Sequence, residues 1–206
     1  MKEKKVKRFL AIALVIFLTT LSYVHTGATK HSIIDNPTYV NTMITEDTIK
    51  NDNVEVKNDS LRLQLIDAVD SHIRKSFKKY DKNLPIYMVD HSLNYNIDLC
   101  FMMAQTTIET GFGTAGAGRP TSRHSLFGVC KRYGDYNSAV EDYCRLLRKS
   151  YLGTKKSEHD LMRNYVTLGG ARYAANRCYE RELSAEYQRI RNKTNIYELW
   201  TELKNS

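Results

Sequence analysis

The chain has 206 residues, 42% of them hydrophobic and 26% charged, which fits one globular domain with attached segments. Three prolines and ten glycines exclude a collagen-like or low-complexity protein. The formal net charge of +8 is high enough to suggest a nucleic-acid partner, so the position of the charges matters.

Half of this charge lies in the first eight residues, where five basic side chains from Lys2 to Arg8 face Glu3 alone, a balance of +4. A largely apolar stretch from Phe9 to Val24 follows. A basic segment before an apolar run is typical of a secretory signal. We predict a signal peptide or signal anchor over residues 1–28, and therefore export to the periplasm or cell wall, or an outward-facing membrane anchor if the segment is not cleaved.

Residues 29–59 are rich in Asn, Asp, Thr and Lys, and their few apolar residues have no sustained period. This composition predicts a flexible polar stalk. From Ser60 onward, apolar residues recur every four positions, which indicates one stripe of an amphipathic helix. These residues are Leu61, Leu65, Val69, Ile73 and Phe77. We therefore place the folded domain at residues 60–206.

The first part of this domain continues with helical signals. Pro85 fits the first turn of a short helix that runs towards His91. Asp98 fits the cap of a helix over Leu99–Thr110, which is apolar on nearly all sides and is therefore predicted to be central to the core.

The second part of the domain is also predicted to be helical. Ser138 and Glu141 have the spacing of a capping box that opens a helix. Two more helices are predicted over residues 176–190 and 195–203. Few segments alternate as strands do, so we expect a mainly α domain.

The glycines of GFGTAG, residues 111–116, match the spacing of a dinucleotide-binding turn. Such a turn has to follow a strand and open a helix. Here the polar residues QTTIET precede it, and Arg119 and Pro120 follow it. We interpret the match as chance and the glycines as a sharp exit from a helix end.

Glu109 ends the most apolar predicted helix, next to Phe112. Desolvation favours the neutral form of a carboxyl group, and the partial negative charge of a helix C-terminus acts in the same direction. A carboxyl group of this kind is suited to general acid catalysis. The alternative is a solvent-facing Glu in a last helical turn, and these physical grounds alone favour that alternative.

Four ordered blocks change this balance. Residues 104–113, AQTTIETGFG, resemble the AQ-x-x-x-E-[ST]-G-[WF]-G signature of bacterial and phage β-N-acetylglucosaminidases that cleave peptidoglycan. Residues 125–129, SLFGV, are similar to the N-[LI]-F-G-[IV] block of that family. Residues 133–143 resemble its F-x-x-Y-x-S block and acidic helix. Residues 170–179 resemble its Y-A-T-D-x-x-Y block.

The resemblance implies an α+β lysozyme-like fold with a substrate groove, in which Glu109 is the essential acid. It implies hydrolysis of the β-1,4 bond after N-acetylglucosamine in the glycan strands of peptidoglycan. Tyr173 would line the groove and position the sugar, unless it is a half-buried core tyrosine. The candidates for substrate contacts are Tyr173, Phe112, Phe127, His124 and Tyr136, of which Phe127 is expected to pack the groove floor.

The chain also departs from the family pattern. His124 and Ser125 stand where many relatives have two asparagines, so His124 is either a substrate contact or a surface loop residue. Gly128 and Tyr133 are five positions apart, which leaves no room for the β-hairpin flap that relatives often insert. We predict that the flap is absent or reduced to a tight turn.

A glycosidase usually needs a second group besides the acid. Asp135 is the best remaining carboxylate, because the capping box already accounts for Glu141. Substrate assistance by the 2-acetamido group of the sugar needs no second carboxylate. The prediction is Glu109 as acid with either substrate assistance or a water activated by Asp135.

The four cysteines and six histidines suggest no further chemistry. An exported protein can form two disulfides with three possible connectivities, and the sequence leaves open whether any bridge forms; the cysteines are Cys100, Cys130, Cys144 and Cys178. The histidines include no HExxH motif and no pair four residues apart, so we predict no metal and no cofactor.

Two other functions remain open. A lytic transglycosylase also relies on one Glu at a helix end, but its usual G-L-M-Q block is replaced here by S-L-F-G. A catalytically silent peptidoglycan-binding module would fit the reduced flap, whereas the intact block around Glu109 favours an enzyme. A nucleic-acid partner is not expected, because the predicted domain has no concentrated basic stripe.

Overall fold

The computed structural model describes residues 46–120, 122–129, 131–154, 156–164 and 177–206. The predicted signal or anchor lies outside these ranges, as do Cys130 and Tyr173. Within them, no helix combines the length and the apolar character that crossing a membrane requires.

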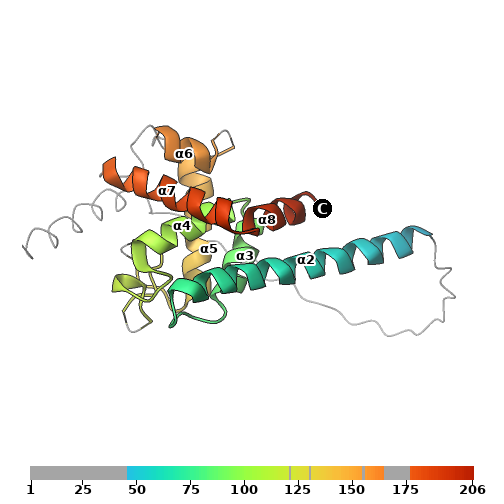
Figure 1. Ribbon diagram of the computed structural model, residues 1–206, viewed down its shortest axis with the longest axis horizontal. Helices are drawn as coiled ribbons and strands as arrows, with labels where there is room; N and C mark the ends of the chain where they lie inside the picture. Colours follow the sequence, from blue (N-terminus) through green and yellow to red (C-terminus); the bar gives the residue numbers. More distant parts are fainter. Residues whose placement is uncertain (1–45, 121, 130, 155, 165–176) are drawn as a thin grey trace, which may run out of the picture. The chain divides into compact units, whose positions relative to one another are not determined.

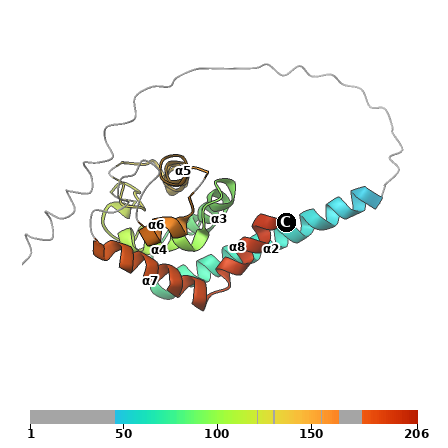
Figure 2. The same cartoon turned by 90° about the horizontal axis from the view of Figure 1, so that it is seen from above.

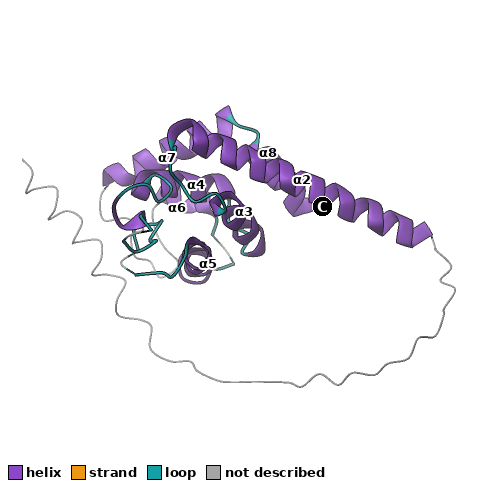
Figure 3. Ribbon diagram, turned by 90° about the horizontal axis from the view of Figure 1, so that it is seen from below, coloured by secondary structure: helices purple, strands orange, loops and turns teal. Residues whose placement is uncertain are grey.

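Helices account for the described structure (Figures 1 and 3). In chain order they are α2 (Glu46–Ser76), α3 (Leu84–Asn94), α4 (Leu99–Thr110), η1 (Gly116–Gly118), α5 (Tyr136–Leu146), η2 (Leu147–Leu152), α6 (Glu158–Asn164), α7 (Arg177–Lys193) and α8 (Ile196–Asn205). The described ranges contain no strand, and the prediction of a mainly α domain is confirmed. The link between Gly128 and Tyr133 is a loop, apart from Cys130, which is not described.

Helix α2 begins earlier than the sequence indicated. The structure divides into two units, residues 1–55 and 56–206, close to the predicted domain start at Ser60. Residues 46–59, predicted as flexible stalk, are nevertheless helical and continuous with the rest of α2. They contain neither Gly nor Pro. Because extending an existing helix costs far less than nucleating one, the helix continues through this polar segment.

The amphipathic stripe of α2 is buried as predicted, with Leu65, Val69 and Ile73 fully inaccessible to solvent. A bidentate ion pair joins this helix to α3, since the guanidinium of Arg62 donates to both carboxylate oxygens of Asp90 at 2.8 Å. The stripe and the ion pair together fix α2 against the remainder of the domain.

Helix α4 is the central element. Eight consecutive residues, Leu99 to Thr106, are buried, and the helix contacts α3, α7 and α8. Figure 2 shows α7 and α8 running past α4 on one side, with α5 on the other. A helix that is apolar all round has to be enclosed in this way.

The start of α4 is fixed by a partly buried network of hydrogen bonds. The carboxylate of Asp98 accepts hydrogen bonds from the backbone N–H of Phe101 at 3.2 Å and from the hydroxyl of Tyr187 at 2.9 Å. The backbone N–H of Asp98 donates to Glu158 at 3.0 Å. The cap predicted at Asp98 is confirmed, and the far end of the helix, about 18 Å away, takes its position from this anchor.

Helix α5 starts with a different cap from the one predicted. Its N-cap is Asp135, whose carboxylate accepts the backbone N–H of Ser138 at 2.7 Å. Ser138 therefore lies inside the first turn, and the predicted capping box with Glu141 is wrong. Asp and Ser are equally good caps. The earlier start is favoured because it buries Tyr136, whose hydroxyl donates to the carbonyl of Gly118 at 2.7 Å.

Candidate active site

Glu109 lies in the last turn of α4, with its carboxyl group against the loop 125–129. A Cβ atom added to Gly128 would lie 2.4 Å from Oε2 of Glu109 and 2.9 Å from its Cδ. Gly128 also has a φ of +70°, a conformation that side chains disfavour. Glycine is needed here because the carboxyl group occupies the space that a side chain would fill.

Burial raises the pKa of Glu109 above its ordinary value, and a side-chain hydrogen bond with Tyr179 of α7 partly opposes this effect. The helix ends at Gly111, which adopts the left-handed conformation with φ of 55°. The carbonyl groups of the last turn give this end a partial negative charge, which further disfavours the carboxylate. Glu109 therefore holds its proton more strongly than an exposed glutamic acid does.

Thr110 fastens the loop to the helix end. Its hydroxyl donates to the carbonyl of Leu126 at 2.8 Å and lies 3.2 Å from the backbone nitrogen of Gly113, which donates to it. Both of these hydrogen bonds are buried, and Thr110 itself is almost inaccessible to solvent. The residue next to Glu109 therefore sets the distance between the loop and the carboxyl group.

The glycine segment provides close packing and no nucleotide site. Gly111 is the helix C-cap, as predicted, and the chain continues through a turn into η1 instead of opening a long helix. A Cβ atom on Gly113 would lie 2.7 Å from the hydroxyl of Tyr136, and one on Gly118 would lie 2.7 Å from Cβ of Thr110.

Three of the predicted substrate contacts support the site from inside. Phe112 is fully buried and packs on Phe77, with ring centroids 5.4 Å apart. Phe127 stacks on Tyr143 at 3.7 Å, in agreement with the packing role expected of it. Tyr136 is buried under the glycine segment. Phe112 and Tyr136 present almost no surface, so the contacts described for them are packing contacts that position the loops.

A buried hydrogen bond continues this support beneath Phe127. The hydroxyl of Tyr143 donates to Oε1 of Gln105 at 2.6 Å. Gln105 belongs to α4, one turn before Glu109, so the stacked pair ties α5 and the loop 125–129 to the helix that carries the acid. The A-Q spacing of the first block was the sequence signal for Gln105.

The remaining predicted residues lie along the loop before α5. His124 is half-buried with a φ of 52°, and its ring meets that of Tyr136 edge-on at 4.9 Å. Asp135 is exposed, and the hydrogen bond from the backbone N–H of Ser138 lowers its pKa. Tyr173 lies outside the described residues. The sequence did not single out Thr110 or Gly128 as residues of the site, although both belong to the blocks at residues 104–113 and 125–129.

No metal centre accompanies these residues. The described residues hold no group of three His, Cys, Asp or Glu side chains placed to bind a metal ion. Cys100 and Cys144 are buried, and burial raises the pKa of both thiols. Both therefore serve as small apolar side chains in the core.

Replacing Glu109 with Gln is expected to increase the free energy of unfolding at pH 7. A carboxyl group whose pKa is raised by folding contributes stability that is fully present below its ordinary pKa, about 4.3, and is lost as the pH rises through the folded value. The advantage of Glu109→Gln should therefore shrink towards pH 4. Urea unfolding between pH 4 and 8 measures it, with Glu182→Gln on the exposed face of α7 as control. A constant difference across this range would contradict the desolvation of Glu109.

The chain was compared with protein families, curated proteins and solved structures. A family model, Glucosaminidase, described as mannosyl-glycoprotein endo-β-N-acetylglucosaminidase, matches residues 86–192, which is just over half of the 206 residues. No curated protein and no solved structure matches the chain. The matched range contains α4 with Glu109, the loop 125–129 and most of α7. The resemblance carried by the four sequence blocks is confirmed, and the chain belongs to the glucosaminidase family of glycoside hydrolases.

Proposed function

We propose that this protein hydrolyses the β-1,4 glycosidic bond after N-acetylglucosamine in the glycan strands of peptidoglycan, with Glu109 as general acid. The observation that carries the proposal is the half-buried Glu109 at the end of α4, whose carboxyl group packs against Gly128. The family match supports a glycan substrate, and the four sequence blocks support the choice of peptidoglycan.

In this proposal, the protonated carboxyl group of Glu109 donates its proton to the glycosidic oxygen as the bond to the anomeric carbon breaks. The raised pKa keeps the proton available closer to neutral pH than an ordinary glutamic acid would. The rigid attachment of the loop 125–129 through Thr110 limits the positions that the carboxyl group can take. Fixed geometry of this kind accounts for much of the rate of an enzyme.

The second catalytic group is proposed to be the 2-acetamido group of the sugar itself, whose carbonyl oxygen attacks the anomeric carbon as the glycosidic bond breaks. Water then attacks the same carbon and displaces the acetamido oxygen, and its proton passes to the Glu109 carboxylate, which restores the acid. Asp135 already accepts the backbone N–H of Ser138 as the cap of α5. This hydrogen bond lowers the pKa of Asp135 and so makes it a weaker base. Substrate assistance needs no protein carboxylate. Export through the N-terminal segment, which would bring the enzyme to the cell wall, is part of the same proposal.

Glu109→Gln should lower the rate of peptidoglycan hydrolysis at least about a thousandfold, because the amide cannot donate the proton. Release of reducing ends from purified peptidoglycan measures the rate, and mass spectrometry identifies the products. Glu182→Gln is the control. Reducing N-acetylglucosamine ends are expected. Wild-type activity of Glu109→Gln would refute the assignment, 1,6-anhydro-muramic ends would show a lytic transglycosylase, and wall binding without cleavage by the wild type would show a silent binding module.

Asp135→Asn should retain most of the activity, because asparagine caps a helix as well as aspartate but cannot take up a proton. Asp135→Ala should lose about 1 kcal/mol of stability through loss of the cap. Thermal unfolding and the rate of hydrolysis are measured on both variants. A hundredfold loss of rate in Asp135→Asn at unchanged stability would instead identify Asp135 as the base that activates water.

Gly128→Ala should reduce the rate far more than Gly116→Ala. Both glycines have positive φ, +70° and +55°, so alanine introduces similar backbone strain at both positions. A Cβ atom at residue 128 would meet the carboxyl group of Glu109, whereas a Cβ atom at residue 116 would have no neighbouring atom within 4 Å. A displacement of about 1 Å at the reacting group can cost about a hundredfold in rate. Equal rates in the two variants would show that the contact with Gly128 does not position the acid.

A further inference from the structure

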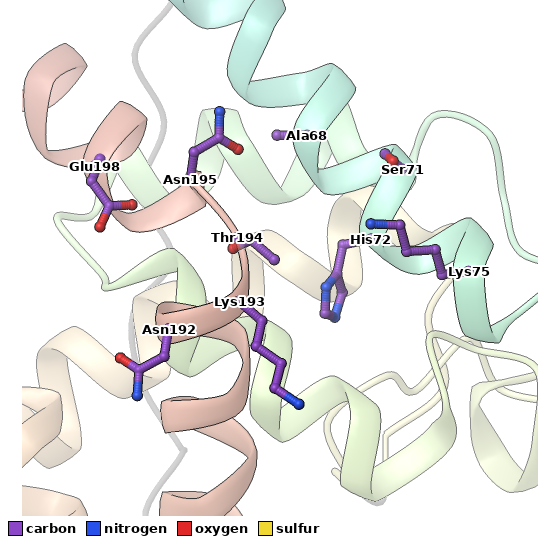
Figure 4. Close-up of a pocket in the computed structure, with 9 residues that line it drawn as sticks. All are labelled: Ala68, Ser71, His72, Lys75, Asn192, Lys193, Thr194, Asn195 and Glu198. Atoms are coloured by element: carbon purple, nitrogen blue, oxygen red, sulfur yellow. The ribbon is translucent and has the colours of Figure 1, made fainter.

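We infer that a cavity between α2 and the connection from α7 to α8 binds a phosphate group, free or esterified. The cavity measures about 480 Å³. Figure 4 shows the residues that line it: Ala68, Ser71, His72, Lys75, Asn192, Lys193, Thr194, Asn195 and Glu198. None of these residues belongs to the four blocks around Glu109, so the inference goes beyond the proposed function and does not rest on it.

Two cations approach the cavity from different elements. Lys75 comes from α2 and Lys193 from the end of α7. Neither ammonium group forms an ion pair with any residue in the described ranges, although several neighbouring charges on these helices do. In Figure 4 the side chain of Lys75 turns back towards Ala68, whereas Glu198 lies at the opposite rim.

Neutral donors complete the lining. Asn195, the N-cap of α8, lines the cavity, and its side-chain oxygen accepts no capping hydrogen bond. Ser71 and Asn192 also line the cavity, and both are exposed. The hydroxyl of Thr194 is already used, since it donates to the carbonyl of Ile190 at 2.8 Å. Amide and hydroxyl donors beside two ammonium groups suit the several acceptor oxygens of a phosphate better than the two of a carboxylate.

His72 stands between the two lysines and reports on the charge of the cavity. Its imidazole is half-buried; burial lowers its pKa, as do the charges of Arg189 and Lys75. Glu186 opposes them, although it is paired with Arg189 at 2.7 Å. The other charged groups lining the cavity are Lys193 and Glu198. An anion bound there would favour the imidazolium and raise the pKa of His72.

The test is an NMR titration of the full chain with inorganic phosphate and, separately, with glycerol 3-phosphate as an esterified form. We expect the His72 ring signals to shift saturably and the pKa of His72 to rise, while His91 and His159 stay unchanged. Lys75→Gln combined with Lys193→Gln should weaken binding at least about tenfold. The control is Lys78→Gln combined with Lys79→Gln, which removes the same charge from exposed positions outside the cavity.

A response to only one of the two compounds identifies whether free or esterified phosphate is the ligand. Equal loss of binding in the two double variants, or shifts of all histidines together, would show general charge attraction and overturn the inference. The absence of any shift at His72 would also overturn it. Because the measurement is binding and not hydrolysis, it can be repeated in Glu109→Gln, so that failure of this site and failure of the proposed function are distinguishable.

Discussion

The contact between the carboxyl group of Glu109 and Gly128 is the constraint on which the site depends. The carboxyl group fills the space of a missing side chain, so it is removed from water on one side by backbone atoms that cannot rotate away. Thr110 holds these atoms in place through the carbonyl of Leu126. Desolvation and position thus have the same origin: the loop that raises the pKa of the acid also fixes its direction.

The remainder of the domain serves to present the end of α4. At its start, the helix is anchored by Asp98. Its carboxylate accepts a hydrogen bond from the hydroxyl of Tyr187, and its backbone N–H donates one to Glu158. Near its end, Gln105 is bonded to Tyr143 of α5, and Tyr143 carries Phe127 on its ring. Both arrangements join residues that are far apart in the chain, so the helix that carries the acid is held at both ends by other elements. Such buried polar bonds are costly to break and favour one arrangement of the core.

Local signals in the sequence predict much of this structure. The four-residue period of α2, the apolar run of α4, the cap at Asp98 and the left-handed end at Gly111 all rest on short-range patterns, and the structure has each of them. The position of Glu109 at a buried helix end also follows from its neighbours. Its role as acid required the family resemblance, because a last-turn Glu facing solvent has the same local pattern.

The features that the sequence did not predict depend on contacts between distant residues. The N-cap of α5 is Asp135 and not the predicted Ser138, because Tyr136 is buried against Gly118, 18 positions earlier in the chain. The extension of α2 to Glu46 reflects helix propagation through a segment with no apolar period. Phe112 and Tyr136 were candidate substrate contacts through the family resemblance, whereas in the fold both side chains are buried.

The site depends most directly on the raised pKa of the Glu109 carboxyl group, which follows from its desolvation against the loop at Gly128. The most direct measurement is a carbon-13 NMR titration of its side-chain carboxyl in the full chain, assigned through Glu109→Gln. The account predicts a pKa clearly above that of an ordinary glutamic acid, about 4.3. A pKa at or below that value would show that the loop at Gly128 does not desolvate the acid, and would contradict the account.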